Sequence, residues 1–314
     1  MMNDNQKNYI NSMLSSKIMF DEVLSKHTTF GIGGPADCLV FPADRNELSL
    51  LLKYAYSSNI PVVFIGSGSN LLVSDSGYKG IVISLKKSFK QISISGNACI
   101  IVESGVMLGT MVKKAMSKNI VGLESLIGVP GTLGGALIMN AGAFGSEISK
   151  YFEEATTMSI NGDLKSYKKN EISFSYRHST FLNNEILIEA KFQCNKGSID
   201  DINRDKLKAS TARKTNQPLK FRSAGSIFKN PSKKLAAGYL IEQAGLKGRE
   251  FGGASISEKH ANFIVNIKNA KASDVIHLIN LAKKNVAEKY NINLELEVKL
   301  IGFDNTKIDK INYA

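Results

Sequence analysis

Two glycine-rich loops constrain the fold of this chain more than any other feature. The first, Gly66-Ser67-Gly68-Ser69-Asn70, directly follows an apolar run at 60–65 that is typical of a buried strand. The second covers residues 128–135, and Asn140-Ala141-Gly142-Ala143 follows it. Glycines let backbone N–H groups approach and bind an anion. One such loop is as well explained by a plain turn, but two loops favour binding of a pyrophosphate group.

Neither loop has the form of a nucleotide-hydrolysing site, because no Gly-Lys-Ser/Thr follows. Residues 31–36 formally satisfy the G-x-G-x-x-A dinucleotide pattern. However, Pro35 would fall inside the required helix, and the residues before Gly31 do not form a buried strand. The sequence therefore argues against both a Walker A site and a Rossmann site.

The chain has 314 residues, which exceeds what one hydrophobic core usually supports, so two or three domains are expected. Residues 1–16 are polar, and no run of about 18 apolar residues occurs, so we expect neither a signal peptide nor a membrane span. These features predict a cytoplasmic protein that does not bind membranes. We expect it to be a monomer.

Basic residues exceed acidic ones, 40 to 28, giving a formal net charge of +12. This excess fits a solvated basic surface, a phosphate-bearing ligand or nucleic acid. No RNP-like aromatic motif or zinc finger is present, so we favour the solvated surface and predict no nucleic-acid partner. The cysteines and histidines lack metal-ligand spacing, which predicts no metal site and no disulfide framework.

Hydrophobic periodicity and turn residues give a coarse order of elements. Asp44 is placed to cap a helix over 44–58, and Asn161-Gly162-Asp163 predicts a tight hairpin. A composition shift near residue 195 marks the main domain boundary. Strands are expected at 60–65, 80–85, 98–102, 186–192 and 295–301, and further helices at 107–116, 195–214 and from Ser273 onward.

The segment 221–231 is suited to proton donation beside an anionic ligand. Ala224 and Gly225 allow close approach, Ser226 carries an O–H donor, and Lys229 and Asn230 supply a cation and an amide. Taken alone, the segment is better explained as a serine- and glycine-rich turn.

Two further segments contain charged residues that are candidates for a functional site. Tyr176-Arg177 offers a guanidinium that can fork onto a carboxylate, although a lone surface arginine would look the same. Glu295 and Glu297 share one face if residues 295–301 form a strand, and ordinary strand-edge charge is the alternative.

Taken in order, these segments resemble the UDP-N-acetylenolpyruvoylglucosamine reductases, flavoenzymes that complete UDP-N-acetylmuramate in bacterial cell-wall synthesis. The resemblance runs from His27 to Gly302 and includes the motifs Gly252-Gly253-Ala254 and His260-Ala261-Asn262. The short interval between Arg177 and Ser226 resembles the shorter type II form, which lacks a long tyrosine-bearing insertion.

The resemblance implies an α+β fold. A two-lobed FAD-binding region of the PCMH/vanillyl-alcohol-oxidase type would cover residues 21–195, with lobes of about 21–88 and 89–195. A substrate-binding domain would cover 196–314, and residues 1–20 would be a mobile N-terminus.

The resemblance also implies the chemistry. NADPH would reduce a non-covalent FAD, and hydride would pass from flavin N5 to C3 of the enolpyruvyl group of UDP-N-acetylglucosamine enolpyruvate. Arg177 would clamp the developing enolate, Ser226 would protonate C2, and Glu297 would assist. The FAD is expected to be non-covalent because neither loop contains histidine or cysteine.

The expected cofactor-binding residues are Gly66, Ser67, Gly68, Ser69, Asn70, Gly128, Gly131, Thr132, Gly134, Gly135 and Gly142. The expected substrate-binding residues are Tyr176, Lys229, Asn230, Lys247 and His260. Lys299 stands where many relatives have arginine, and Arg222 is also unusual; the sequence explains neither.

Two alternatives remain open at this stage. One is an FAD oxidase of the same fold that acts on another alcohol or sugar. The other is a basic nucleic-acid-binding protein in which the glycine-rich loops are only turns.

Overall fold

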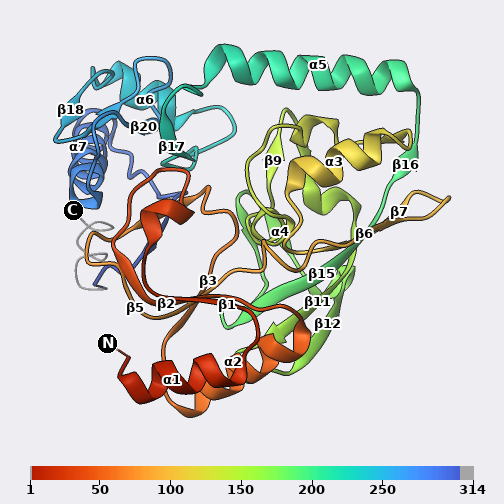
Figure 1. Ribbon diagram of the computed structural model, residues 1–314. Helices are drawn as coiled ribbons and strands as arrows, with labels where there is room; N and C mark the ends of the chain where they lie inside the picture. Colours follow the sequence, from red (N-terminus) through yellow and green to blue (C-terminus); the bar gives the residue numbers. More distant parts are fainter. Residues whose placement is uncertain (1, 305–314) are drawn as a thin grey trace. The chain divides into compact units, whose positions relative to one another are not determined.

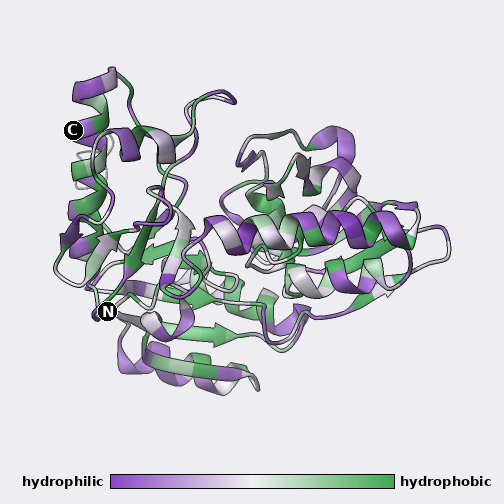
Figure 2. Cartoon of the chain, turned by 90° about the horizontal axis from the view of Figure 1, so that it is seen from above, coloured by the Kyte–Doolittle hydropathy of each residue, from purple (hydrophilic) through white to green (hydrophobic). Residues whose placement is uncertain are grey.

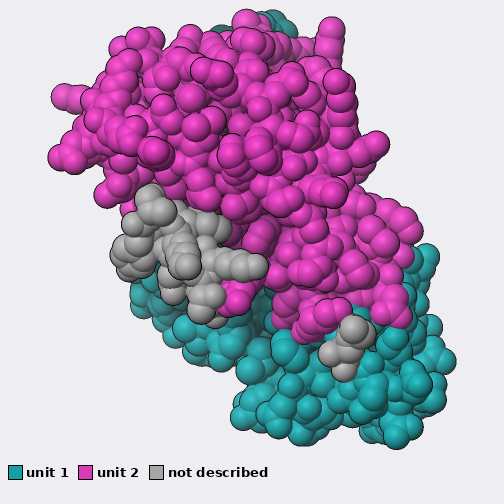
Figure 3. Space-filling model, turned by 90° about the vertical axis from the view of Figure 1, so that its left-hand side faces the viewer, with its two compact units in different colours: residues 1–20, 37–67, 80–213 teal, residues 21–36, 68–79, 214–314 magenta. Residues whose placement is uncertain are grey.

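The computed structural model describes residues 2–304 (Figure 1). The chain divides into two compact units, coloured separately in Figure 3. Unit 1 contains residues 1–20, 37–67 and 80–213, and unit 2 contains residues 21–36, 68–79 and 214–314. This division differs from the expected boundary at residue 195, because the segments 21–36 and 68–79 join the C-terminal unit.

The larger part of unit 1 is built on a five-stranded antiparallel sheet with strand order β12-β11-β15-β7-β6. Phe152, the first residue of β11, is fully buried, and three phenylalanine rings meet it edge-on. Helix α4 packs on β7 and β15. The strands and helices are β6 (Ile92–Ile94), β7 (Cys99–Glu103), β11 (Phe152–Ser159), β12 (Leu164–Lys168), β15 (Glu185–Gln193), α3 (Leu108–Met116) and α4 (Leu133–Ile138). Shorter strands in this part are β8 (Ile120–Val121), β9 (Gly142–Ala143), β10 (Ser146–Glu147), β13 (Phe174–Ser175), β14 (His178–Ser179) and β16 (Asn195–Lys196).

A second core in unit 1 includes residues of helices α1 and α2 and of the four-stranded sheet β1-β2-β5-β3. Asp44 caps α2 as predicted, since its carboxylate accepts hydrogen bonds from the N–H groups of Asn46 and Glu47 at 2.8 and 2.9 Å. The elements are α1 (Asp4–Met13), β1 (Lys17–Val23), β2 (Pro35–Phe41), α2 (Arg45–Ser57), β3 (Val62–Phe64) and β5 (Tyr78–Ile83).

Residues 1–20 were expected to form a mobile segment, but the structure gives most of them regular form. Asn3 and Gln6 form a reciprocal capping box that begins α1. Ile10 is fully buried, and the ring of Tyr9 lies 4.6 Å from that of Tyr54 on α2. The sequence did not reveal this helix because its composition is polar and one buried apolar residue gives no clear period.

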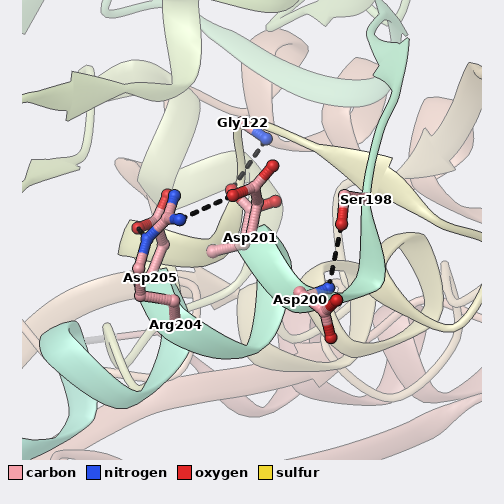
Figure 4. Close-up of polar contacts among 7 residues, drawn as sticks. Gly122, Ser198, Asp200, Asp201, Arg204 and Asp205 are labelled. Carbon is pink, nitrogen blue, oxygen red and sulfur yellow. Dashed lines mark hydrogen bonds and ion pairs between the residues drawn. The ribbon is translucent and has the colours of Figure 1, made fainter.

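Helix α5 (Ile199–Asn216) is the charged helix predicted from the composition of residues 195–214. Figure 4 shows its first turns, where the Ser198 hydroxyl accepts a hydrogen bond from the Asp200 N–H at 3.2 Å. Arg204 forms an ion pair with Asp201 at 2.6 Å. Within the helix only Ile202 and Ala209 are buried, so its surface is mostly polar.

Unit 2 contains a four-stranded antiparallel sheet with order β17-β20-β19-β18 and a parallel pair, β4 and β21. The buried faces of α6 and α7 form one hydrophobic core with the sheet. In Figure 2 apolar residues gather on the strands, as this packing requires. The elements are β4 (Leu71–Val73), β17 (Arg222–Ser226), α6 (Ala237–Gln243), β18 (Glu250–Phe251), β19 (Ala254–Ile256), β20 (Phe263–Asn266), α7 (Ala272–Tyr290) and β21 (Lys299–Ile301).

Within residues 2–304, no helix has both the length and the apolar character needed to cross a membrane.

Candidate active site

The first glycine-rich loop lies between β3 and β4, and its glycines are required by close packing. Gly68 has φ +71°, and a Cβ there would collide with the carbonyl oxygen of His27. The Thr29 N–H donates to the Gly68 carbonyl at 3.0 Å, which fixes this part of the loop. The hydroxyl oxygen of Ser67 is buried and, among the described residues, has no hydrogen-bond partner. Such a group is suited to a ligand that brings its own acceptor.

The second loop, residues 128–135, lies directly before helix α4. Gly128 and Gly131 have φ values of +78° and +142°, which favour glycine. Thr132 is the N-cap of α4, with its hydroxyl 3.4 Å from the Gly135 N–H. A Cβ on Gly66 would stand 2.5 Å from that same hydroxyl oxygen, so the first loop lies against the second at this point.

These features fit a bound FAD. Ser67 offers a buried hydroxyl with no partner among the described residues, and the positive φ angles of Gly68, Gly128 and Gly131 are those of tight turns whose main-chain N–H groups can bind a pyrophosphate. Arg213 donates from its guanidinium to the Gly128 carbonyl and adds positive charge beside this loop. The sequence did not single out Arg213.

Arg177 lies in the tight turn between β13 and β14. Its φ of +56° is unusual for a residue other than glycine, and such strained positions often occur at ligand sites. The guanidinium carbon lies 5.1 Å from the ring centre of Tyr176, which is 44% exposed. The cation is therefore held against the aromatic ring of its neighbour.

A buried asparagine joins this turn to the second glycine-rich segment. Asn140 is fully buried, and its amide donates to the Ser175 carbonyl at 3.0 Å and to the Glu147 carboxylate at 2.9 Å. Gly142 packs closely against Glu147, since a Cβ added to this glycine would stand 2.8 Å from the Glu147 Cγ. The structure thus brings the segment 128–142 and the Arg177 turn together within unit 1. The sequence contains Asn140 beside the loop but gives no sign of this role.

Ser226 ends strand β17, where the pairing with β20 is interrupted by a bulge between Ser223 and Ser226. Gly225 has φ +77°, which allows the local turn. The next two residues are held by Asn262, which is 4% exposed. Its amide oxygen accepts from the Phe228 N–H at 2.9 Å, and its amide nitrogen donates to the Phe228 carbonyl at 2.8 Å. Its own carbonyl accepts from the Ile227 N–H at 2.9 Å, so one buried side chain and its backbone fix the serine segment.

Glu297 lies in a segment that is hydrogen-bonded to the residues directly after Ser226. The Glu297 N–H donates to the Ile227 carbonyl at 2.8 Å, and Phe228 pairs with Leu296 in an isolated antiparallel bridge. Two of the predicted catalytic residues, Ser226 and Glu297, are thereby brought together within unit 2. Glu295 does not share the more sheltered position of Glu297: its side chain is 76% exposed and pairs with Lys229 at 3.4 Å.

The remaining substrate candidates already have structural contacts. The Lys247 ammonium pairs with Glu242 at 2.8 Å, and Asn230 accepts from the Ala237 N–H at 3.1 Å. Burial, and secondarily the charge of Lys247, lowers the pKa of His260. Its Nδ1 is placed 3.2 Å from the Asn262 N–H, where the neutral ring can accept a hydrogen bond.

The structure gives Arg222 a bracing role and shows the electrostatic surroundings of Lys299. The Arg222 guanidinium lies over Gly31 and donates to the Thr28 carbonyl at 3.3 Å, so it braces the 25–31 segment. For Lys299, desolvation and then the charge of Lys229 lower the pKa of its ammonium group.

Residues 36–166 match the family model described as an FAD binding domain. The first part of the chain is therefore an FAD-binding region of the PCMH type, which confirms the predicted fold class. Residues 217–301 match the model described as UDP-N-acetylenolpyruvoylglucosamine reductase, C-terminal domain.

Whole-chain relatives agree with both matches. The chain is 40% identical over 298 residues to UDP-N-acetylenolpyruvoylglucosamine reductase 2 of Bacillus cereus, covering 94% of this chain and 97% of the relative. It is 40% identical over 301 residues to the reductase of Syntrophus aciditrophicus, covering 95% and 96% of the two chains. The crystal structure of the Thermus caldophilus reductase is 34% identical, with a TM-score of 0.78 over 92% of this chain and 99% of that one. The chain belongs to the UDP-N-acetylenolpyruvoylglucosamine reductase family.

Proposed function

We propose that this protein reduces UDP-N-acetylglucosamine enolpyruvate to UDP-N-acetylmuramate, with FAD as its bound cofactor and NADPH as the hydride donor. Family membership supports the reaction class. The observation that best supports the proposed site is the 2.8 Å hydrogen bond from the Glu297 N–H to the Ile227 carbonyl. It holds the backbone of Glu297 beside Ile227, the residue that follows the proposed proton donor, Ser226.

The glycine-rich loops are the part of the chain that holds the cofactor. Gly68, Gly128 and Gly131 give the loops tight turns that can direct main-chain N–H groups at a pyrophosphate, and Gly66 lets the first loop pack on Thr132 of the second. The buried hydroxyl of Ser67 supplies a donor that the described protein atoms do not use. The loops contain no histidine or cysteine, so the cofactor is held without a covalent bond. The chemistry that bound FAD supplies is hydride transfer, from NADPH to the vinyl C3 of the substrate.

Three side chains are proposed to stabilise the negative charge that develops on the substrate and to supply the proton for C2. Addition of hydride at C3 leaves charge at C2 that delocalises into the substrate carboxylate as an enolate. The Arg177 guanidinium, with its planar set of donors, clamps that carboxylate. The Ser226 hydroxyl gives its proton to C2, and Glu297 assists by hydrogen bonding.

A serine suits this step although its hydroxyl is a weak acid. An enolate carbon is basic enough to take a proton from a polarised hydroxyl, and general acids of this kind typically contribute about a hundredfold or more. Lys229 lies two residues beyond the carbonyl that receives the Glu297 N–H, and its own N–H donates to the Glu295 carbonyl at 2.9 Å. Its ammonium adds positive charge near the serine segment.

The proposal also covers where the enzyme acts, its oligomeric state and the residues that contact the substrate. The enzyme acts as a cytoplasmic monomer of the shorter type II form, on a small sugar nucleotide rather than on nucleic acid or a membrane. Tyr176, Lys229, Asn230, Lys247 and His260 contact the substrate. Residues 21–195 hold the flavin, and residues 196–314 hold the sugar nucleotide.

The test is an anaerobic two-step experiment on the purified protein. A yellow protein that releases flavin on denaturation is expected, and NADPH should bleach it. Addition of the enolpyruvyl sugar nucleotide should restore the colour rapidly. A flavin that is reoxidised by oxygen but not by this substrate would instead indicate an FAD oxidase. A colourless protein that binds oligonucleotides would overturn the flavoenzyme proposal.

A further inference from the structure

Asn70 is the last residue of the first glycine-rich loop, and its contacts set it apart from the other loop residues. Its side-chain nitrogen donates to the main-chain carbonyl of Glu297 at 3.0 Å. Its own main-chain carbonyl accepts from the Lys299 N–H, also at 3.0 Å. Asn70 therefore brackets Val298 and holds the backbone on both sides of it.

The bracket adds to the backbone hydrogen bonds that already tie residues 295–298 to the serine segment. Residues 295–297 do not belong to a regular strand, and β21 begins only at Lys299. From Leu71 onward, β4 pairs with β21 in parallel, so the bracket begins this pairing. Glu297 uses its N–H for the Ile227 carbonyl and its carbonyl for Asn70. Its backbone therefore lies between the serine segment and the flavin loop, bound to each.

The Asn70 side chain contacts the carbonyl oxygen of Glu297, which can only accept a hydrogen bond. Only the amide nitrogen can make this hydrogen bond, because an oxygen in its place would repel the carbonyl. A carboxylate at position 70 would have the same shape and the opposite effect. The loop hydroxyl of Ser67, in contrast, has no partner among the described residues and is left for a ligand.

We infer that the Asn70 side chain is a positioning residue for Glu297 rather than a ligand of the cofactor. The inference rests on the proposed function, and it changes the role that the sequence pattern gave to Asn70. The loop then does two things: its glycines and Ser67 face the cofactor, and its last residue sets the backbone of the proposed catalytic carboxylate. Placement of Glu297 becomes dependent on the conformation of the loop.

The test compares Asn70→Asp and Asn70→Ala with two controls, Ser67→Ala and Asn46→Asp. Asn46 is exposed on α2, so it controls for the chemistry of the Asn-to-Asp change alone. FAD affinity is measured by titrating the apoprotein, and each half-reaction is measured by stopped flow with saturating FAD. We expect Asn70→Ala to keep its FAD dissociation constant within about twofold, whereas Ser67→Ala weakens FAD binding by about threefold or more.

Reoxidation of the reduced flavin by the enolpyruvyl substrate should slow by about tenfold or more in both Asn70 variants, since small displacements of a reacting group are costly. Reduction by NADPH should stay within about threefold in both. The aspartate variant should be the slower of the two, because its oxygen repels the Glu297 carbonyl. Asn46→Asp should match the wild type.

Two results would overturn the inference. One is weaker FAD binding by Asn70→Ala, comparable to that of Ser67→Ala, with reoxidation within about twofold of wild type. The other is an aspartate variant that reacts faster than the alanine variant, which would indicate that position 70 only fills space.

A readout that needs no turnover separates this inference from the proposed function. Amide hydrogen exchange in residues 294–301 of the FAD-loaded protein should speed up in Asn70→Asp and not in Asn46→Asp. Exchange in β20 should not change. If the wild-type flavin is not reoxidised by the enolpyruvyl substrate, the proposed function fails, while exchange and FAD affinity still decide the role of Asn70.

Discussion

Replacing Asn262 with alanine should both destabilise unit 2 and slow the step that uses Ser226. The Asn262 side chain makes two hydrogen bonds with the backbone of Phe228, at 2.9 and 2.8 Å. Phe228 is 2% exposed and Asn262 is 4% exposed, so water does not readily replace the lost amide. Alanine would leave one buried N–H and one buried carbonyl without partners.

The size of the effect follows from those two groups. A buried polar group left without a partner costs about 1–3 kcal/mol, and at about 1.5 kcal/mol each the two groups together cost roughly 3 kcal/mol. For a domain of about 150–250 residues, each kcal/mol lowers the melting temperature by about 2–4 °C. We therefore expect the melting temperature of the transition that includes unit 2 to fall by about 6–12 °C.

The assay is thermal and urea unfolding of the variant beside Asn46→Ala, whose side chain is exposed on α2. The surface control should stay within about 0.5 kcal/mol of wild type. In stopped flow, Asn262→Ala should also reoxidise its flavin more slowly with substrate, because the segment after Ser226 is no longer fixed. A loss of stability below about 0.5 kcal/mol would mean that the two Phe228 groups do not depend on Asn262.

Three further outcomes are expected. Gly68→Val should give a folded protein with little flavin, because a side chain there meets the His27 carbonyl; full retention of the yellow colour after dialysis would contradict this. Arg177→Lys keeps the charge but loses the planar fork, so reoxidation by substrate should slow by about a hundredfold to a thousandfold while reduction by NADPH changes little; equal effects on the two steps would argue against a clamp on the substrate. Burial disfavours the charged form of Glu47, but hydrogen bonds from Ala43 and Ser15 outweigh it and lower its pKa from 4.5 to about 2. Because the folded pKa is depressed, the ionised Glu47 stabilises the protein above about pH 4.5, and this contribution is lost as the pH falls toward 2. The difference in unfolding free energy between wild type and Glu47→Gln should therefore shrink over that range. A difference independent of pH would contradict the assignment of the lowered pKa to Glu47.

Local signals in the sequence predicted many of the elements. Asp44 has the side chain that a helix N-cap requires, and α2 begins directly after it. The Asn161-Gly162-Asp163 turn joins β11 and β12 as predicted, with Gly162 at φ +80°. In each case the information lies within a few residues, so no distant partner is needed to interpret it.

Elements whose form depends on distant partners were harder to predict. The expected strand over 295–301 is regular only from Lys299, because its first part pairs with the serine segment and its second part pairs with β4. The segments 21–36 and 68–79 join unit 2 through contacts such as those of Arg222 with Thr28. The spacing of apolar residues in the sequence does not show which distant segment a stretch of chain will pair with.

The candidate site shows the same limit. The sequence supplied Ser226 and Glu297 through the family resemblance, and the structure places them on neighbouring segments. It did not supply the roles of Asn140 and Asn262, because these asparagines act by binding backbone groups about 35 positions away along the chain. A buried asparagine and an exposed one look alike in a single sequence.

In the proposed reaction Ser226 donates the proton in the second half-reaction of an FAD-dependent reductase. Single-turnover stopped flow on Ser226→Ala with bound FAD tests this role. NADPH should bleach the flavin of the variant at nearly the wild-type rate. Reoxidation by UDP-N-acetylglucosamine enolpyruvate should slow by about a hundredfold or more, as expected for loss of a general acid. Reoxidation within about threefold of wild type would contradict the proton-donor role, because the hydroxyl would then contribute little to protonation at C2.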